Sequence, residues 1–425
     1  MASYLVASLV VLLILGFPMF MVMMVPSVTA LAFFQSHIPI FTLVQRMIGG
    51  ISPFPLTAVP LFILAADIML KGEMAKRLTR FAEVLVGHLT GGLAHTTILA
   101  SLIFGAVSGS TQATVAAIGS NMYPTLIKRG YSRSFATALI VNASDVSQLI
   151  PPSIMLIVYG VVTGTSISSL FIAGIIPGLL LGLAFMVYSW YWAKKNNIPK
   201  NQKPTFGNLK QATIEAIGPL GFTLIIIGGI YSGTFSPTEA AAVAVGYSFI
   251  METFVFRSIT IKDMGAIALK SGTTTALVFV LIGGAEAMVW LLTISRIPLT
   301  VSTFIIGLNS SPLALLLLIN VTFFIALMFF NPISAVVVIT PLFLPVIKAL
   351  GIDPVHLGVL ITLNAAIGSA TPPFGVDLFT ACAIFRLPFN TVVKGVGPFV
   401  ICGIIVLLVL TVFPEMVTFL PRLLL

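Results

Sequence analysis

The sequence predicts an all-α polytopic membrane protein whose second half repeats the first. Charged residues make up 8% of the 425 residues, against roughly 25% in soluble proteins, and hydrophobic residues make up 58%. Residues 1–45 and 297–347 contain no Asp, Glu, Lys or Arg. These runs are continuously apolar, whereas the strands of a membrane β-barrel alternate between polar and apolar positions. We therefore expect membrane-spanning helices.

The repeat is visible in prolines and glycines that recur at an offset of 221 residues. The matching pairs are Pro124 and Pro345, Pro151 and Pro372, Pro152 and Pro373, Pro177 and Pro398, Gly130 and Gly351, and Gly174 and Gly395. Membrane helices bend, break or turn at such residues, so the two halves share a backbone plan. That plan is typical of a secondary transporter built from two related units around a central site.

The composition also argues against other classes of protein. The net charge of +9 is spread over short loops, which is a topology signal rather than a nucleic-acid-binding surface. Cys382 and Cys402 lie in apolar stretches and form no CxxC motif, so we interpret them as packing residues. The sequence has no P-loop and no HExxH motif, and its four histidines are scattered. We therefore expect a protein that is not an enzyme.

The apolar runs predict the elements in order. Residues 4–26 are expected to be a retained helix, because the run is long for a signal-peptide core and lacks a basic start. A short segment at 28–45 precedes the first repeat. That repeat comprises a helix at 53–71, an amphipathic stretch at 73–88, an apolar pair at 91–127, an interrupted helix at 134–163 and a long helix at 169–193.

The second repeat follows a basic loop at 194–210 and two helices at 212–231 and 236–256. We expect a basic amphipathic stretch at 258–271, a helix at 272–292, a connector at 294–309, an apolar pair at 312–347, an interrupted helix at 354–385 and a long helix at 388–412.

Each apolar pair is expected to form a re-entrant hairpin. The first pair has an uncharged polar tip at 108–112, and each side of about 16 residues is shorter than the ~20 needed to span a bilayer. The second pair has its tip at Asn331-Pro332. The alternative is two full helices joined by a surface loop. The lack of charge at the tips favours the hairpin.

The hairpins determine how the repeats are oriented. If hairpins do not cross, each repeat crosses three times and two helices separate the repeats, so the second repeat is inverted. This arrangement places 17 of the 21 Lys and Arg residues on one face and leaves Arg46, Arg296, Lys348 and Arg422 on the other. The positive-inside rule makes the first face, with the loop at 194–210, cytoplasmic.

At four places inside the membrane, several backbone groups lose their helical hydrogen-bond partners. They are the tips at 108–111 and 331–334 and the interruptions at 142–153 and 364–373. A Pro-Pro pair removes two N–H donors, so carbonyls one turn earlier lose their helical bonds beside Ser, Thr and Asn oxygens. These uncharged oxygens suit Na⁺, and half-helix N-termini at the tips suit an anion. A Pro-Pro pair alone is also compatible with a structural kink.

Acidic residues have less defined roles. Asp145 lies in the first interruption and is a candidate cation ligand or proton site. The alternative is a position near a wetted helix end. Asp377 follows the second interruption and is also a candidate helix cap. Asp67, Glu239 and Glu286 fit buried pairs or helix-end charges, and the sequence does not rank them.

Seven motifs run through nearly the whole chain in order. They are FGAVSGSTQATVAAIG from Phe104, KRGY from Lys128, LIPPS from Leu149, LFIAGIIPG from Leu170, TPLFLP from Thr340, PVHLGV from Pro354 and TPPFG from Thr371. Together they resemble the large membrane subunit of TRAP (tripartite ATP-independent periplasmic) transporters. The resemblance implies Na⁺-coupled uptake of an organic anion across the bacterial inner membrane. It also implies a periplasmic substrate-binding protein and a separate small four-helix membrane subunit as partners.

The resemblance further implies an elevator-type ion-transporter architecture, in which a transport domain moves against a scaffold. The scaffold would comprise 1–70 and 211–292, the arms 71–90 and 293–309, and the transport domain 91–193 and 310–425, with 194–210 as a cytoplasmic loop.

Site residues follow from the same resemblance. Na⁺ is expected near the first tip and interruption, at Ser108, Gly109, Asn142, Ser147 and Ile150, and near the second, at Ser334, Asn364, Gly368 and Thr371. Substrate is expected between the tips, at Ser110, Thr111, Ser153 and Asn331. Many relatives have an acid at the place of Asn331, and the stretch 142–145 is more polar than the family pattern. These extra polar groups favour a sialic acid over a C4-dicarboxylate or another organic acid.

Two other classes are less well supported. An ion channel usually places identical elements around an axis, whereas inverted repeats with hairpins fit alternating access. An intramembrane enzyme needs acids, histidines or metal ligands clustered near the membrane surface, and the sequence shows no such cluster.

Overall fold

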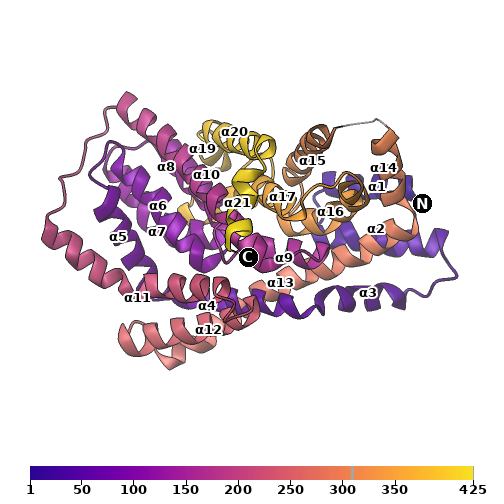
Figure 1. Cartoon of the computed structure of the whole chain (residues 1–425), viewed down its shortest axis with the longest axis horizontal. Coiled ribbons are helices and arrows are strands. Elements are labelled where there is room, and N and C mark those ends of the chain that lie inside the picture. The colour runs from indigo at the N-terminus through magenta and orange to yellow at the C-terminus, as the bar shows by residue number, and fades with distance from the viewer. Residues whose placement is uncertain (308–310, 425) are drawn as a thin grey trace.

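The computed structural model describes residues 1–307 and 311–424, and within these ranges the chain is helical and has no β-strand (Figure 1). The all-α prediction is confirmed. Five described helical segments are long and apolar enough to cross a membrane: Phe54–Lys71, Ile167–Lys195, Phe206–Tyr231, Ile261–Ile294 and Pro332–Ala349. The chain is a polytopic membrane protein.

The helices of the first half occur in the predicted order. They are α1 (Ala2–Ile14), α2 (Met19–Phe34), α3 (Phe41–Ile51), η1 (Phe54–Thr57), α4 (Ala58–Lys71), α5 (Met74–Val86), α6 (Gly92–Ser108), α7 (Thr111–Lys128), α8 (Arg133–Asp145), η2 (Val146–Gln148), α9 (Ile154–Thr163) and α10 (Ile167–Lys195). The linking helices are α11 (Phe206–Tyr231), α12 (Pro237–Ile250) and the π-helical turn η3 (Met251–Val255).

The second half contains α13 (Ile261–Ile294), α14 (Ile297–Gly307), α15 (Pro312–Leu327), α16 (Pro332–Ala349), α17 (Pro354–Ser369), α18 (Val376–Phe385), α19 (Phe389–Val393), α20 (Gly397–Val412) and α21 (Glu415–Leu424). Its boundaries reproduce those of the first half. Helix α16 begins and ends 221 residues after α7, and α17 begins 221 residues after α8. The repeat read from prolines and glycines is therefore a repeat of helices.

The prediction of one helix at 4–26 is wrong. The structure has two antiparallel helices, α1 and α2, and the Tyr4 hydroxyl donates to Thr29 Oγ1 across them at 2.8 Å. Gly16 adopts a left-handed conformation (φ +75°) and Pro18 is the N-cap of α2, so the chain reverses there. The predicted segment at 28–45 is divided between the end of α2 and the start of α3.

Three other boundaries differ from the prediction. The stretches 258–271 and 272–292 form one helix, α13, because a capping box of Thr260 and Asp263 starts it and no proline interrupts it. The helix predicted at 388–412 is divided into α19 and α20, because Pro398 lies in the first turn of α20. Beyond it, α21 bends away from α20 by 62°. The basic loop is shorter than predicted, because α10 extends to Lys195 and α11 begins at Phe206.

Parts of two predicted domain segments lie outside the described residues. These are residues 308 and 309 of the predicted arm, and residues 310 and 425 at the ends of the predicted last segment.

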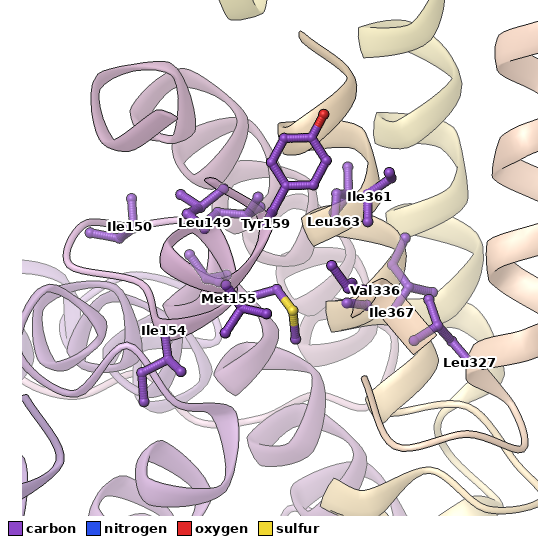
Figure 2. Packing of buried hydrophobic residues seen from close by; sticks show 14 of the residues in the cluster. Leu149, Ile150, Ile154, Met155, Tyr159, Leu327, Val336, Ile361, Leu363 and Ile367 are labelled. Carbon is purple, nitrogen blue, oxygen red and sulfur yellow. The ribbon is translucent and has the colours of Figure 1, made fainter. Parts of the chain in front are cut away.

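The two repeats pack against each other through their broken helices. Figure 2 shows Tyr159 of α9 beside Leu363 and Ile361 of α17, and Met155 of α9 directed toward Val336 of α16. The Tyr159 hydroxyl donates to the Pro354 carbonyl at 2.8 Å. Gly358 makes room for the ring, since a Cβ there would lie 2.5 Å from Tyr159 Cε1. This interface fixes how the two interruptions lie relative to each other.

Candidate substrate cavity and cation sites

The tips of the two hairpins meet at one cavity of about 280 Å³. The hairpins α6–α7 and α15–α16 lie on opposite sides of the centre of the molecule in Figure 1. The first tip lines the cavity with residues 108–113, and the second tip with residues 331–333. The remaining wall includes residues of α4 and α13, among them Ile63, Leu70 and Val278.

Each tip starts a helix that begins at the cavity. Ser110 is the N-cap of α7, and its hydroxyl accepts a hydrogen bond from the Ala113 N–H at 3.4 Å. Asn331 is the N-cap of α16, and its Oδ1 accepts from the Ile333 N–H at 3.0 Å. Two helix N-termini, each with a partial positive charge, thus face the same space. They provide an electrostatic preference for a carboxylate.

The first tip is in backbone contact with the first interruption. A Cβ on Gly109 would lie 2.2 Å from the Pro152 carbonyl oxygen, and a Cβ on Gly105 would lie 2.6 Å from Ser147 Cα. The structure thereby brings together the predicted cation ligands Ser108, Gly109 and Ser147. Ser108 Oγ also lies 3.1 Å from Thr114 Oγ1.

The second tip contacts the second interruption in the same way. A Cβ on Gly368 would lie 2.5 Å from Leu327 Cβ, and the Phe374 N–H donates to the Met328 carbonyl at 3.2 Å. The Thr371 hydroxyl donates to the Ile367 carbonyl at 2.6 Å. Each interruption therefore packs on the hairpin of its own repeat.

Several buried oxygens in both places have no hydrogen-bond partner among the described residues. They are Asn142 Oδ1 and Gln148 Oε1 in the first repeat, and Ser334 Oγ and Asn364 Oδ1 in the second. Buried polar atoms are normally hydrogen bonded, so such atoms need a further partner. Neutral oxygens of this kind fit Na⁺, which is therefore chemically compatible with both places.

The predicted substrate residues do not all lie at the cavity. Ser110, Thr111 and Asn331 line it. Ser153 is fully buried behind the first tip, where its hydroxyl accepts from the Leu156 N–H at 3.3 Å and caps α9. Ile150, one of the predicted cation ligands, packs its side chain close to Gly178 and does not line the cavity.

A charged pair at the cavity was not singled out by sequence reasoning. Lys270 Nζ lies 2.7 Å from Asp67 Oδ1, and the Ser271 hydroxyl donates to Asp67 Oδ2 at 2.8 Å. Asp67 and Lys270 are the charged members of the described cavity wall. Asp67 is the one acid in the run 53–70, which is a usable signal. Nothing local connects it with Lys270, 203 residues later.

Asp377 is linked to the same cavity. The Thr111 hydroxyl, at the first tip, donates to Asp377 Oδ1 at 2.9 Å. The carboxylate thus binds the opposite repeat, and its side chain does not cap α18, for which Gly375 is the N-cap. The sequence-based expectation of a helix cap is wrong.

Comparison with known proteins gives a consistent picture. Residues 6–416 match the family described as "Tripartite ATP-independent periplasmic transporter, DctM component". The chain is 47% identical over 426 aligned residues to the ectoine TRAP transporter large permease protein TeaC of Halomonas elongata, covering 99% of each. It is 38% identical to the sialic acid TRAP transporter large permease protein SiaM of Vibrio cholerae, covering 89% of each.

A solved structure shares the fold at low sequence identity. It is Neisseria gonorrhoeae MtrF, which was described in a study of antimetabolite efflux pumps. The TM-score is 0.60 with 13% identity, over 87% of this chain and 83% of that one. This likeness concerns the fold alone.

Proposed function

This chain belongs to the DctM component family of tripartite ATP-independent periplasmic (TRAP) transporters, and from that premise we propose that it takes up an ectoine-like zwitterion coupled to Na⁺. It is a transporter permease and not an enzyme. The observation that carries the substrate class is the charge balance of the cavity between the two tips.

That cavity has no net charge among its described residues. Asp67 and Lys270 neutralise each other at 2.7 Å, and the second tip offers the neutral amide of Asn331. The two helix N-termini offset about one negative charge, so a dicarboxylate would enter with uncompensated negative charge. Ectoine carries a carboxylate and a delocalised amidinium in one ring, so its charges balance internally. The greater identity to TeaC than to SiaM supports ectoine over the sialic acid expected from the sequence.

Cation coupling is proposed from the unpartnered oxygens. One Na⁺ would lie between the first tip and Asn142, and another between the second tip and Asn364, each transported as a co-substrate. Each Na⁺ would hold its tip against its interruption. Because the same tips line the cavity, filling the cation sites would shape the substrate site.

An elevator movement is proposed for the transport step. The tips would belong to a moving domain formed by 91–193 and 310–425. Helices α4 and α13 would belong to the scaffold formed by 1–70 and 211–292, with arms at 71–90 and 293–309. The cavity lies where these proposed parts meet, which is where a moving domain would carry substrate past a scaffold.

The proposed setting is the bacterial inner membrane, with 194–210 on the cytoplasmic side. As one component of a tripartite system, the chain would work with a small four-helix membrane subunit and a periplasmic substrate-binding protein.

The test is uptake into proteoliposomes that contain the chain and its small subunit, with the binding protein outside. Radiolabelled ectoine, sialic acid and succinate would be compared with and without an inward Na⁺ gradient. Concentrative ectoine uptake that needs Na⁺ and the binding protein supports the proposal. Uptake of succinate or sialic acid alone would overturn the substrate class, and ectoine flux that ignores Na⁺ would overturn Na⁺ coupling.

Ser110→Ala is expected to raise the KM for substrate roughly tenfold. The hydroxyl lines the cavity, and losing one hydrogen bond from it to a substrate carboxylate costs about 1.5 kcal/mol, which is roughly tenfold in KM. Initial uptake rates at saturating Na⁺ measure this. Ser166→Ala is the matched control, because Ser166 caps α10 through the Ser169 N–H away from the cavity. Equal KM values for the two variants would remove Ser110 from the substrate site.

Thr371→Ala is expected to raise the Na⁺ concentration for half-maximal uptake several-fold, with less effect on the maximal rate. Thr371 precedes the second Pro-Pro pair, and its hydroxyl lies among the proposed ligands. Thr362→Ala is the control, because the Thr362 hydroxyl likewise donates to the carbonyl four residues earlier, that of Gly358, within α17. Uptake would be measured over a Na⁺ series, and an unchanged midpoint would count against Thr371 as a ligand.

A further inference from the structure

Two buried aspartates of the broken helices have no basic partner. Asp145 is the last residue of α8 and is 1% exposed, and Asp377 lies in the first turn of α18 and is 0% exposed. Helices α8 and α18, which carry the two aspartates, pack against each other. Neither aspartate belongs to the ion pairs found among the described residues.

Their oxygens are largely unsatisfied. Thr111 donates to Asp377 Oδ1, but Asp377 Oδ2 and both oxygens of Asp145 have no hydrogen-bond partner among the described residues. An ionised carboxylate inside a membrane protein is costly unless something compensates its charge. Three unsatisfied carboxyl oxygens, contributed by the two repeats, therefore need a positively charged partner.

The surrounding helices do not supply that partner. Arg133 begins α8 twelve residues before Asp145, which is about 18 Å along the helix. Lys128 ends α7 and Arg386 follows α18, each at a helix end. His95 and His356 are hydrogen bonded to the Thr90 and Leu410 carbonyls. The other titratable groups on helices packed against α8 or α18 are Tyr123, Tyr188, Tyr191, Lys194, Lys195, Asp353, Cys382 and Cys402.

The helix ends indicate where compensation is needed. Asp145 lies at the C-terminal end of α8, where the partial charge of the helix is negative. Asp377 lies at the N-terminal end of α18, where that partial charge is positive and stabilises a carboxylate. One cation, held mainly by Asp145, would therefore satisfy the pair.

We propose that Asp145 and Asp377 bind one Na⁺ ion in addition to the two Na⁺ ions proposed within the repeats. The proposal rests on the proposed function. Thr111 connects the site to transport, because its hydroxyl bonds Asp377 while the residue lines the substrate cavity. The cation would offset the charge of Asp145 before the transport domain moves, while the N-terminus of α18 stabilises Asp377, so each substrate would be accompanied by one more positive charge.

The experiment measures the charge moved per substrate in proteoliposomes holding the chain and its small subunit. Ectoine uptake would be followed at membrane potentials set with K⁺ and valinomycin. Asp145→Asn and Asp377→Asn are each expected to move about one elementary charge fewer than the native chain. The Hill coefficient for Na⁺ is also expected to fall in both variants. A lost dependence on pH with an unchanged Na⁺ response would show that the pair binds a proton and would overturn the Na⁺ site.

Asp263→Asn is the matched control, because Asp263 is an exposed capping residue. The proposal is overturned if both test variants transport with the native charge per substrate. A second measurement covers variants that do not transport: the thermal unfolding midpoint of the purified complex in NaCl and in choline chloride. The variants should lose part of the rise in midpoint caused by Na⁺, and an undiminished rise in both variants would also overturn the proposal.

The two proposals fail in distinguishable ways. The unfolding measurement needs no substrate. If the native chain does not take up ectoine but the two variants lose the rise in unfolding midpoint caused by Na⁺, only the proposed substrate is contradicted. A native chain that takes up ectoine while both variants behave like Asp263→Asn contradicts only the Asp145–Asp377 cation site.

Discussion

Gly109→Ala is expected to abolish Na⁺-driven uptake while the chain still inserts and folds. Gly109 is the C-cap of α6 and has φ +57°, where an L side chain costs about 1–2 kcal/mol. The larger effect is steric, since the new Cβ would lie 2.2 Å from the Pro152 carbonyl. The tip must then move away from the first interruption, which opens the proposed Na⁺ site. Proteoliposome uptake measures the loss, with detergent-solution stability confirming folding.

Gly130→Ala separates these two causes. Gly130 also has positive φ (+89°), but no atom lies within 4 Å of a Cβ placed there. It therefore carries the backbone strain without the clash and should retain most of the uptake. Similar activities for the two variants would show that close contact between the first tip and Pro152 is not required.

The fold was predictable where breaks have a local cause. The Pro-Pro pairs and the apolar hairpins gave the repeat boundaries closely, because proline and uncharged polar tips act within a few residues of themselves. The N-terminal segment was not predictable from apolar length alone, since the turn at Gly16 and Pro18 lies inside an uninterrupted apolar run. In such a run, one long helix and two short helices joined by a turn have the same apolar composition.

The site was predictable to the level of tips and interruptions. Ser110, Thr111 and Asn331 line the cavity because hairpin tips converge, and the hairpins were visible in the sequence. Ser153 adjoins the same region, but a serine after Pro-Pro is equally suited to cap the next helix, which is what it does. The pairs across the repeats depend on packing between distant segments, which local sequence does not encode.

One such distant contact attaches the start of α5 to the linking helices. Glu252, fully buried in the π-helical turn η3, accepts hydrogen bonds from the backbone N–H groups of Glu73 at 3.0 Å and Met74 at 2.8 Å. The Ser258 hydroxyl also donates to it. Gly72 leaves space for this carboxylate, since a Cβ there would lie 2.1 Å from Glu252 Cδ. Glu252 thus caps the start of α5 from another helix.

Glu252→Ala is expected to release the start of α5 and to reduce uptake more than tenfold. Two hydrogen bonds from backbone N–H groups to a buried charge are lost, at about 1.5–3 kcal/mol each, and the donors are left without a partner. The Arg80–Glu215 ion pair between α5 and α11 is a weaker polar attachment, because it is partly exposed and such pairs contribute about 0–1 kcal/mol. Limited proteolysis within 71–90, the unfolding midpoint and uptake measure the effect. Glu239→Ala is the control, because Glu239 caps only its own helix, α12, at the surface. If Glu252→Ala behaves like this control in all three measurements, the hydrogen bonds to Glu252 do not hold the start of α5 in place. If proteolysis within 71–90 increases while uptake stays normal, attachment of α5 at its start is not needed for transport.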